Sequence, residues 1–324
     1  MELDLKDKKI LFELDKNSRA NLSEISKKVG LSKEVVFHRI NKLLEEKIIV
    51  QCLTVPASYR FGLVGYKVYL KLVNASKESI NKFVEYLYND SSIYWTAISK
   101  GKWDFMFGIW AKNIYDFDSI YNKMLDKFSK FIQEKELSIG LETLQFNRCW
   151  LYNDGSDRKQ FNFGEKEEQI VLDSKDQQII NILNGNSRIK LVDLAEKTKL
   201  SPKVVAYRIK EMEKKKIIRG YKIFLNPNIV GFNVYKSFVY LKNVNEKRKK
   251  EFLDYCKRLP NLTYIVLTFA PWDLEMGFET SDDKEYYKIM EDIKEKFNDI
   301  VSSYDSTIIL EEPRHKYLIS GKDK

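Results

Sequence analysis

The chain repeats itself at an offset of 169 residues, and this repeat constrains its architecture more than any other feature of the sequence. Residues 3–49 align with residues 172–218 without a gap, and 20 of the 47 aligned positions are identical. The pair Trp103-Asp104 recurs as Trp272-Asp273 at the same offset. Because the register persists this far along the chain, we predict a duplicated module that fills each half.

The composition is that of an ordinary globular protein. The chain has 324 residues, of which 44% are hydrophobic and 32% charged, which favours two or more folded domains over disorder. Its apolar runs are too short to span a membrane, and the charged opening MELDLKDKK argues against a secretory signal. Three scattered cysteines and two histidines, His38 and His315, argue against a disulfide framework and a zinc site. We therefore expect a cytoplasmic protein without a metal or another cofactor.

The first part of each copy predicts three helices. In the first copy they cover about Leu5–Asp15, the segment from Asn21 to Gly30, and the segment after Ser32. Asp4, Asn21 and Ser32 are residues that favour the N-cap position. The short turn between the second and third helices has the length and pattern of a helix-turn-helix.

The second part of each copy alternates between strands and helices. In the first copy the predicted elements are Gly65–Val73, Lys77–Asn89, Ile93–Ser99, Trp103–Trp110, Ile114–Lys130 and Glu136–Phe146. Their order, β-α-β-β-α-β, is the ferredoxin-like arrangement. The sequence thus predicts an α+β protein.

Positive charge is concentrated in the helical parts of the two copies. The chain has a net charge of +9, and residues 3–60 hold 12 Lys and Arg against 8 Asp and Glu, which gives +4. Residues 172–229 hold 13 against 6, which gives +7, so the rest of the chain is slightly negative. A basic helix-turn-helix favours double-stranded DNA as the partner, and a solvated basic surface is the alternative.

Together these motifs resemble the Lrp/AsnC, or feast/famine, family of transcription regulators. The resemblance rests on Leu3-Asp4 before the first helix and Asn17-Ser18-Arg19 after it, and on Leu31-Ser32 and Arg39-Ile40 around the third helix. It also rests on the Gly-x-Trp-Asp motif at residues 101–104. It implies a winged helix-turn-helix followed by a ferredoxin-like ligand-sensing and dimerisation domain in each copy. It also implies a fused pseudo-dimer, in which the two copies take the places of two subunits, with higher homo-oligomers as an option.

The repeat and the resemblance together define the expected domains. Winged helix-turn-helix domains are expected at residues 1–60 and 171–229, ferredoxin-like domains at 64–148 and 233–319, and a linker at 149–170. The segment after Ile218 is closer to the family pattern than the segment after Ile49. The sequence therefore does not decide whether the first copy forms a wing.

The third helix of each copy is the candidate recognition helix. With Val36, Ile40, Leu43 and Leu44 facing inward, its polar side chains can meet base edges and phosphates in a major groove. The candidate DNA-binding residues are Lys33, Glu34, His38, Arg39, Asn41 and Lys42 in the first copy, and Lys203, Tyr207, Arg208 and Lys210 in the second. For Arg39 and Arg208 two hypotheses stand side by side: contact with phosphate, or an ion pair that braces the helix. For Arg19 and Arg188 we expect a structural role that ties the first helix to its loop.

The Gly-x-Trp-Asp turn is a second candidate site. Its N–H groups can bind a carboxylate, its aspartate can meet an ammonium group, and effectors of the resembled family bind around this turn. Gly101, Lys102 and Asp104 are therefore candidates for binding an amino acid, and a purely structural turn is the alternative. The second copy has Ala270-Pro271 instead, and because proline lacks an N–H we expect no equivalent site there.

Two other functions compete with transcription regulation. Siroheme decarboxylases resemble the same family, and some are tandem fusions, but they are expected to carry a histidine and an arginine in the third strand. Residues 92–107 and 261–278 contain neither, so we expect no enzyme. A sensing or oligomerising protein that has lost DNA binding would show an acidic or broken third helix, whereas both third helices here are basic and uninterrupted.

Overall fold

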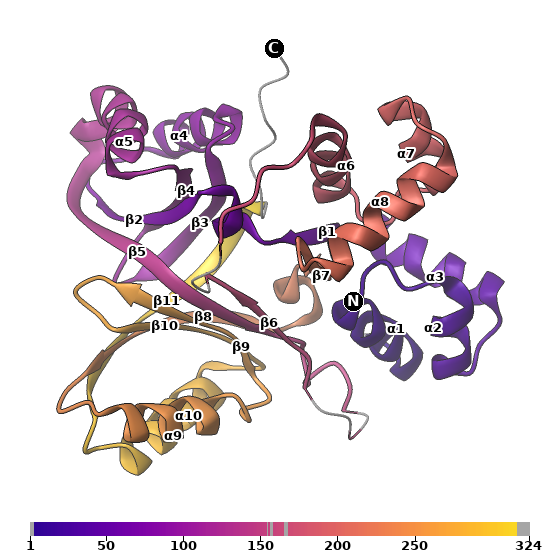
Figure 1. Ribbon diagram of the computed structural model, residues 1–324. Helices are drawn as coiled ribbons and strands as arrows, with labels where there is room; N and C mark the ends of the chain where they lie inside the picture. Colours follow the sequence, from indigo (N-terminus) through magenta and orange to yellow (C-terminus); the bar gives the residue numbers. More distant parts are fainter. Residues whose placement is uncertain (1–2, 154, 156–157, 165–167, 316–324) are drawn as a thin grey trace.

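The computed structural model describes residues 3–153, 155, 158–164 and 168–315 (Figure 1). Two helical units lie on one side of the molecule, and two sheets with their covering helices lie on the other. The order of elements confirms the predicted α+β class and the duplication, with a helix-turn-helix followed by a ferredoxin-like unit in each half.

The helical units follow the predicted pattern closely. Their helices are α1 (Leu5–Lys16), α2 (Leu22–Val29) and α3 (Lys33–Glu45), then α6 (Ser174–Gly185), α7 (Leu191–Thr198) and α8 (Pro202–Lys214). The side chains of Asp4, Asn21 and Ser32 accept backbone N–H groups, so the three predicted N-caps are confirmed. The prediction that Leu44 faces inward is wrong, since it is 37% exposed. Adjacent helix positions differ by about 100°, and Leu43 already takes the inward one.

The strands that follow the recognition helices pair with each other across the two copies. Strand β1 (Ile49–Pro56) lies antiparallel to β7 (Ile218–Leu225) in a two-stranded sheet. Strand β1 also contacts α6, and β7 contacts α1, so each strand packs on the first helix of the other copy. The segment after Ile49 therefore forms a strand like its counterpart, although its sequence is less typical.

The ferredoxin-like units contain all the predicted elements. In the first copy they are β2 (Val64–Leu72), α4 (Lys77–Asn89), β3 (Ile93–Gly101), β4 (Phe105–Ala111), α5 (Ile114–Phe128) and β5 (Ile132–Phe146). In the second they are β8 (Asn233–Leu241), α9 (Glu246–Cys256), β9 (Leu262–Phe269), β10 (Leu274–Thr280), α10 (Asp283–Lys296) and β11 (Val301–His315).

The two sheets join into a closed ring of strands. The order is β2-β4-β3-β11-β8-β10-β9-β5, and β5 pairs with β2 again. The long strands β5 and β11 each pair with a strand of their own copy and then with one of the other copy. The paired helices α4–α5 and α9–α10 pack on the outer faces, so the inner faces of the two sheets lie against each other.

The predicted linker is largely built into the fold. Strand β6 (Gln160–Phe163) lies within it and pairs with the end of β5. Before this strand, the ring of Trp150 stacks on Phe232, with ring centroids 4.0 Å apart. Residues 154, 156–157 and 165–167 of the predicted linker lie outside the described part of the chain.

A buried charge cluster connects the first helical unit to the second sheet. The guanidinium of Arg148 contacts Asp15 of α1 and Glu279 of β10, both at 2.8 Å. These side chains are only 11%, 0% and 4% exposed. Lys222 of β7 lies 3.7 Å from the same Asp15 carboxylate. The cluster thus fixes α1 on the ring of strands.

In the described residues, no helix combines the length and the apolar character needed to cross a bilayer. In the same residues, no three His, Cys, Asp or Glu side chains come together in a way that could hold a metal ion.

Arg148→Ala should lower the free energy of unfolding by about 3–5 kcal/mol, because Asp15 and Glu279 would lose the cation that compensates their burial. Urea unfolding of the full chain measures this change. Lys82→Ala, which removes an exposed pair with Glu78, is the control and should leave the stability nearly unchanged. Equal effects of the two substitutions would show that the buried cluster contributes little.

Candidate functional site

The outward faces of α3 and α8 carry the predicted DNA-binding side chains. Lys33, Glu34, His38 and Lys42 are exposed on α3, and Asn41 is half-buried. Lys203, Tyr207 and Lys210 are exposed on α8. The inward faces of the two helices consist of buried apolar residues: Val36, Ile40 and Leu43 in α3, and Val205, Ile209 and Met212 in α8. Because both helices begin at exposed serine N-caps, their first turns are free to approach a partner.

Exposed apolar side chains beside these residues were not predicted. Phe37 is 48% exposed and Val35 41%, and Val204 of α8 is 40% exposed. Apolar groups on a recognition helix can contact the methyl group of thymine. In the sequence these three residues can be recognised as apolar positions of the third helices that lie outside the buried helical stripe.

Arg39 and Arg208 are engaged within their own helical units. The Nη1 atom of Arg39 lies 2.7 Å from Asp4 Oδ2 and 2.8 Å from Asp7 Oδ1. Arg208 contacts Asp173 and Asp176 in the same way, at 2.6 and 2.8 Å. Of the two hypotheses for these arginines, this geometry favours the brace, since it holds each recognition helix against the start of the first helix.

The pKa values of the N-cap aspartates reflect this arrangement. The backbone N–H of Asp7, together with the Arg39 guanidinium, holds the pKa of Asp4 below its usual value. In the second copy Arg208 is the main cause of the lowered pKa of Asp173. Both carboxylates therefore remain ionised and keep the brace in place at neutral pH.

The two NSR motifs bind each other across the copies. Arg19 donates to the carbonyl oxygen of Ser187, and Arg188 donates to the carbonyl oxygens of Ser18 and Ala20, at 2.7 and 2.9 Å. The hydroxyl groups of Ser18 and Ser187 are 2.7 Å apart and buried. The two arginines thus have structural contacts, but the predicted tie between each helix and its own loop is wrong, since both side chains join the two helical units.

The Gly-x-Trp-Asp turn of the first copy is occupied by contacts within the chain. The backbone N–H groups of Lys102 and Trp103 donate to Ser306 O and Thr307 Oγ1, both at 3.2 Å. The Lys102 ammonium lies 3.0 Å from Asp305. Asp104 accepts hydrogen bonds from the backbone N–H of Leu72 at 2.9 Å and from the ammonium group of Lys71 at 3.0 Å. Lys102 and the turn backbone therefore hold β3 against β11, and Asp104 is held by the end of β2, which favours the structural alternative.

Gly101 is required for this close approach. Its φ is +124°, and a Cβ atom at this position would lie 2.6 Å from the carbonyl oxygen of Ser306. Any side chain would force β3 and β11 apart, so the glycine serves the junction of the two sheets.

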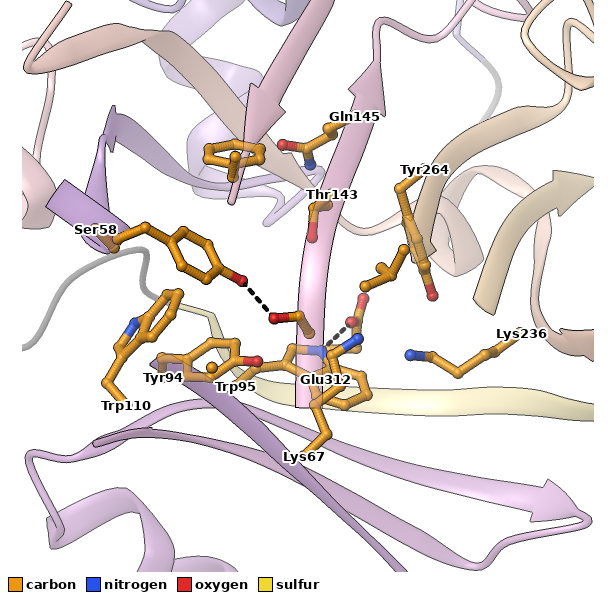
Figure 2. A pocket seen from close by; sticks show the side chains of 15 residues that line it. Ser58, Lys67, Tyr94, Trp95, Trp110, Thr143, Gln145, Lys236, Tyr264 and Glu312 are labelled. Atoms are coloured by element: carbon orange, nitrogen blue, oxygen red, sulfur yellow. Dashed lines mark hydrogen bonds between the residues drawn. The ribbon is translucent and has the colours of Figure 1, made fainter. Parts of the chain in front are cut away.

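A cavity of about 130 Å³ lies between the two sheets, which we call the inter-sheet cavity (Figure 2). Its lining comes from both copies and from the segment after β1: Ser58, Tyr59, Gly65, Lys67, Tyr94, Trp95, Trp110, Gly140, Thr143, Gln145, Phe163, Lys236, Tyr264, Val266 and Glu312. Most of these side chains are aromatic or apolar, and a few charged groups converge among them, as in many ligand sites.

A buried cluster of three charges borders the inter-sheet cavity. Lys67 Nζ and Lys236 Nζ lie 2.6 and 2.7 Å from the same oxygen of Glu275. Burial would raise the pKa of Glu275, but the two ammonium groups lower it to about 2. Burial lowers the pKa of Lys67 to about 8, against the attraction of Glu275. At neutral pH these three side chains therefore carry one net positive charge.

A second carboxyl group, that of Glu312, lies on the lining of the inter-sheet cavity. It accepts a hydrogen bond from Trp95 Nε1 at 2.6 Å. Burial raises the pKa of Glu312 above its usual value, against the effect of the Trp95 hydrogen bond. Glu312 is therefore held by an indole N–H, whereas Glu275 is held by two ammonium groups.

The inter-sheet cavity was not predicted from the sequence. A usable signal is the lysine that interrupts two otherwise apolar strands at the same repeat position, Lys67 in β2 and Lys236 in β8. Its partner Glu275 replaces Met106 of the first copy, so the repeat alone gives no hint of the pair.

Comparison with known proteins identifies the helical units. The family profile for winged helix-turn-helix DNA-binding domains matches the chain twice, at residues 3–50 and 172–219. The leucine-responsive regulatory protein of Haemophilus influenzae is 38% identical over 131 residues, which is 39% of this chain and 76% of that protein. The proline dehydrogenase transcriptional activator of Rhodobacter capsulatus is 31% identical over 121 residues, which is 37% of this chain and 79% of the activator.

The solved structures of the siroheme decarboxylase NirDL resemble the whole chain. The siroheme decarboxylase NirDL, in complex with an iron-uroporphyrin III analogue, has a TM-score of 0.63, and the match covers 97% of this chain and 94% of NirDL. The sequences are only 12% identical, so the likeness shows a shared fold and carries no statement about activity.

Gly101→Ala should lower the free energy of unfolding by about 1–3 kcal/mol, because alanine disfavours the positive φ and its Cβ would collide with the backbone of Ser306. Gly185→Ala is the matched control: its Cβ would meet open space at the end of α6, and it should gain about 0.4–1 kcal/mol. Urea unfolding of both variants measures the difference. If Gly101→Ala is as stable as Gly185→Ala, the junction of β3 and β11 does not depend on this glycine.

Proposed function

This chain belongs to the Lrp/AsnC family of transcription regulators, as a tandem duplication within one polypeptide, and from this premise we propose that it binds two DNA half-sites of unlike sequence as a fused pseudo-dimer. DNA binding by a winged helix-turn-helix is common to both halves of the chain. The proposal concerns how the two halves share the task.

The observation that carries the proposal is the lock between the two helical units. The exchanged bonds of Arg19 and Arg188 and the pairing of β1 with β7 join the units at their centre. A rigid pair of helix-turn-helix units can present two recognition helices to successive major grooves on one face of a duplex, about 34 Å apart.

The recognition helices differ in charge at equivalent positions of the repeat. Glu34 of α3 corresponds to Lys203 of α8, and Lys42 of α3 corresponds to Glu211 of α8. His38 corresponds to Tyr207. Acidic, basic and aromatic side chains prefer different base edges, so equivalent positions on α3 and α8 should read different bases.

Replacing Lys33, Lys42, Lys203 and Lys210 by alanine should weaken duplex binding strongly. The slope of log affinity against log salt concentration should become shallower by about 1 for each phosphate that is no longer neutralised. Arg39 and Arg208 are kept because they brace the helices. Fluorescence anisotropy over a salt series is the measurement. The matched control removes four exposed lysines from the outer helices, Lys82, Lys123, Lys250 and Lys284. A folded recognition-helix variant with unchanged affinity would remove the basis of the proposal.

Selection from random duplexes should yield a binding site made of two half-sites in inverted orientation, and the two half-sites should differ in sequence. The triple variant Glu34→Lys, His38→Tyr, Lys42→Glu gives α3 the side chains of α8 at the three positions. Its selected site should become more symmetric, because both helices would then read similar bases. A fully symmetric site for the unmodified protein, or a site that the triple variant does not alter, would contradict the proposal.

Siroheme decarboxylation, the enzyme activity that competes with regulation in the sequence analysis, is the second candidate function. Neither β3 nor β9 carries the histidine or arginine expected in such enzymes. Titration with haem or siroheme tests this candidate: a tetrapyrrole absorption band at stoichiometric amounts would favour it over the regulator.

A further inference from the structure

We propose that the inter-sheet cavity binds a small aromatic carboxylate, with its carboxylate at Lys67 and Lys236 and its ring packed against Tyr59, Tyr94 and Trp110. The site lies between the two sheets (Figure 2). Its lining includes no residue of the Gly-x-Trp-Asp turn or of the recognition helices. The cavity itself is observed independently of any role in DNA binding.

The charge beside the cavity favours an anion. Lys67 and Lys236 both contact one oxygen of Glu275, whose other oxygen accepts from the hydroxyl of Tyr69. Two ammonium groups thus share one carboxylate, and both lysines line the cavity whereas Glu275 does not. The Glu312 carboxyl group is engaged by an indole N–H instead. One further carboxylate beside Lys67 and Lys236 would pair the second ammonium group.

The opposite end of the cavity is built from aromatic rings. Tyr94 stacks on Trp110 with ring centroids 4.5 Å apart, and Tyr59 meets Trp110 edge-on at 5.7 Å. Trp110 Nε1 is buried and has no hydrogen-bond partner among the described residues. A planar ligand can pack against these rings, and a polar substituent on it can accept the unpaired N–H.

The size of the cavity limits the ligand. A water molecule needs about 10–15 Å³ of such space, so 130 Å³ accommodates about ten non-hydrogen atoms. One aromatic ring with a short carboxylate side chain meets this limit. An α-ammonium group, as in a free amino acid, would lie close to the two lysines and be repelled.

Duplication has opened this space on one side only. Gly65 and Gly140 line the cavity, and their equivalents in the other copy are Val234 and Ile309. A Cβ at Gly65 would lie 3.1 Å from the Trp110 ring, and a Cβ at Gly140 would lie 3.2 Å from the Tyr59 hydroxyl. The aromatic rings therefore sit where the other copy has aliphatic side chains.

The site also touches a segment that holds the second recognition helix. Tyr59 lines the cavity, and its neighbour Arg60 donates from Nη1 to the carbonyl oxygen of Lys215, the C-cap of α8, at 2.8 Å. A ligand that packs against Tyr59 should therefore alter the affinity for DNA. This regulatory consequence rests on the proposed function, whereas ligand binding does not.

Calorimetry on the full chain without DNA tests the site, with benzoate and phenylacetate as probes. Phenylacetamide has the shape of phenylacetate without its charge, and phenylalanine adds the ammonium group. We expect binding of the carboxylates and at least about ten-fold weaker binding of the other two. No heat at millimolar carboxylate, equal binding of the amide, or tighter binding of the amino acid would each overturn the proposal.

Lys67→Met is the decisive variant. It leaves Glu275 paired with Lys236, so the fold should persist, and it removes the excess positive charge. The carboxylates should bind at least about ten-fold more weakly. Lys71→Met, on the same strand and outside the cavity, is the matched control and should bind as the unmodified chain does. A full affinity in Lys67→Met, with its fold checked by thermal melting, would contradict the assignment.

The regulatory consequence has its own measurement. Duplex affinity, followed by anisotropy, should change at least about three-fold when phenylacetate is added at saturation, and Lys67→Met should remove the change. If the chain binds phenylacetate and DNA but neither affects the other, the regulatory link fails. If the chain binds phenylacetate and no DNA, the proposed function fails and the binding site stands.

Discussion

Backbone hydrogen bonds between the two copies are the interaction on which the rest of this structure depends. Strands β5 and β11 are long enough to pair first with a strand of their own copy and then with one of the other. This exchange closes the ring, so that each of its eight strands pairs with a neighbouring strand on both sides. A closed sheet is protected against edge-to-edge association with other chains. The cavity, the buried charges and the position of α1 all follow from the closed ring, because each is assembled from residues of both copies.

The sequence predicted what depends on neighbours along the chain. The N-caps at Asp4, Asn21 and Ser32, the helical and alternating apolar periods, and the repeat predict the three helices and the ferredoxin-like elements of each copy, but not strand β6 in the linker. These features are local, so the residue pattern carries them. The error at Leu44 is also local: two leucines stand side by side, and only one of them can face the core.

What the sequence could not predict is contact between residues far apart in the chain. Arg19 reaches the second copy rather than its own loop, because the pairing of β1 with β7 brings the two NSR motifs together. The linker contributes β6 since the end of β5 leaves an edge open. The inter-sheet cavity depends on β2, β4, β5 and β8 meeting around it, and no spacing along the chain encodes that meeting.

The chemistry of the cavity is also one that a symmetric dimer of single copies could not reach. In such a dimer each residue occurs twice, so two equivalent lysines would face either two glutamates or none. The fused chain instead places Glu275 opposite both Lys67 and Lys236, while the first copy keeps Met106 at the equivalent position. The odd number of charges in this cluster gives it a net positive charge, and Gly65 opens space on the side where its equivalent in the second copy, a valine, closes it. Duplication within one chain therefore allows the two halves to diverge at the recognition helices and at the cavity independently, while the strand pairing between them stays intact.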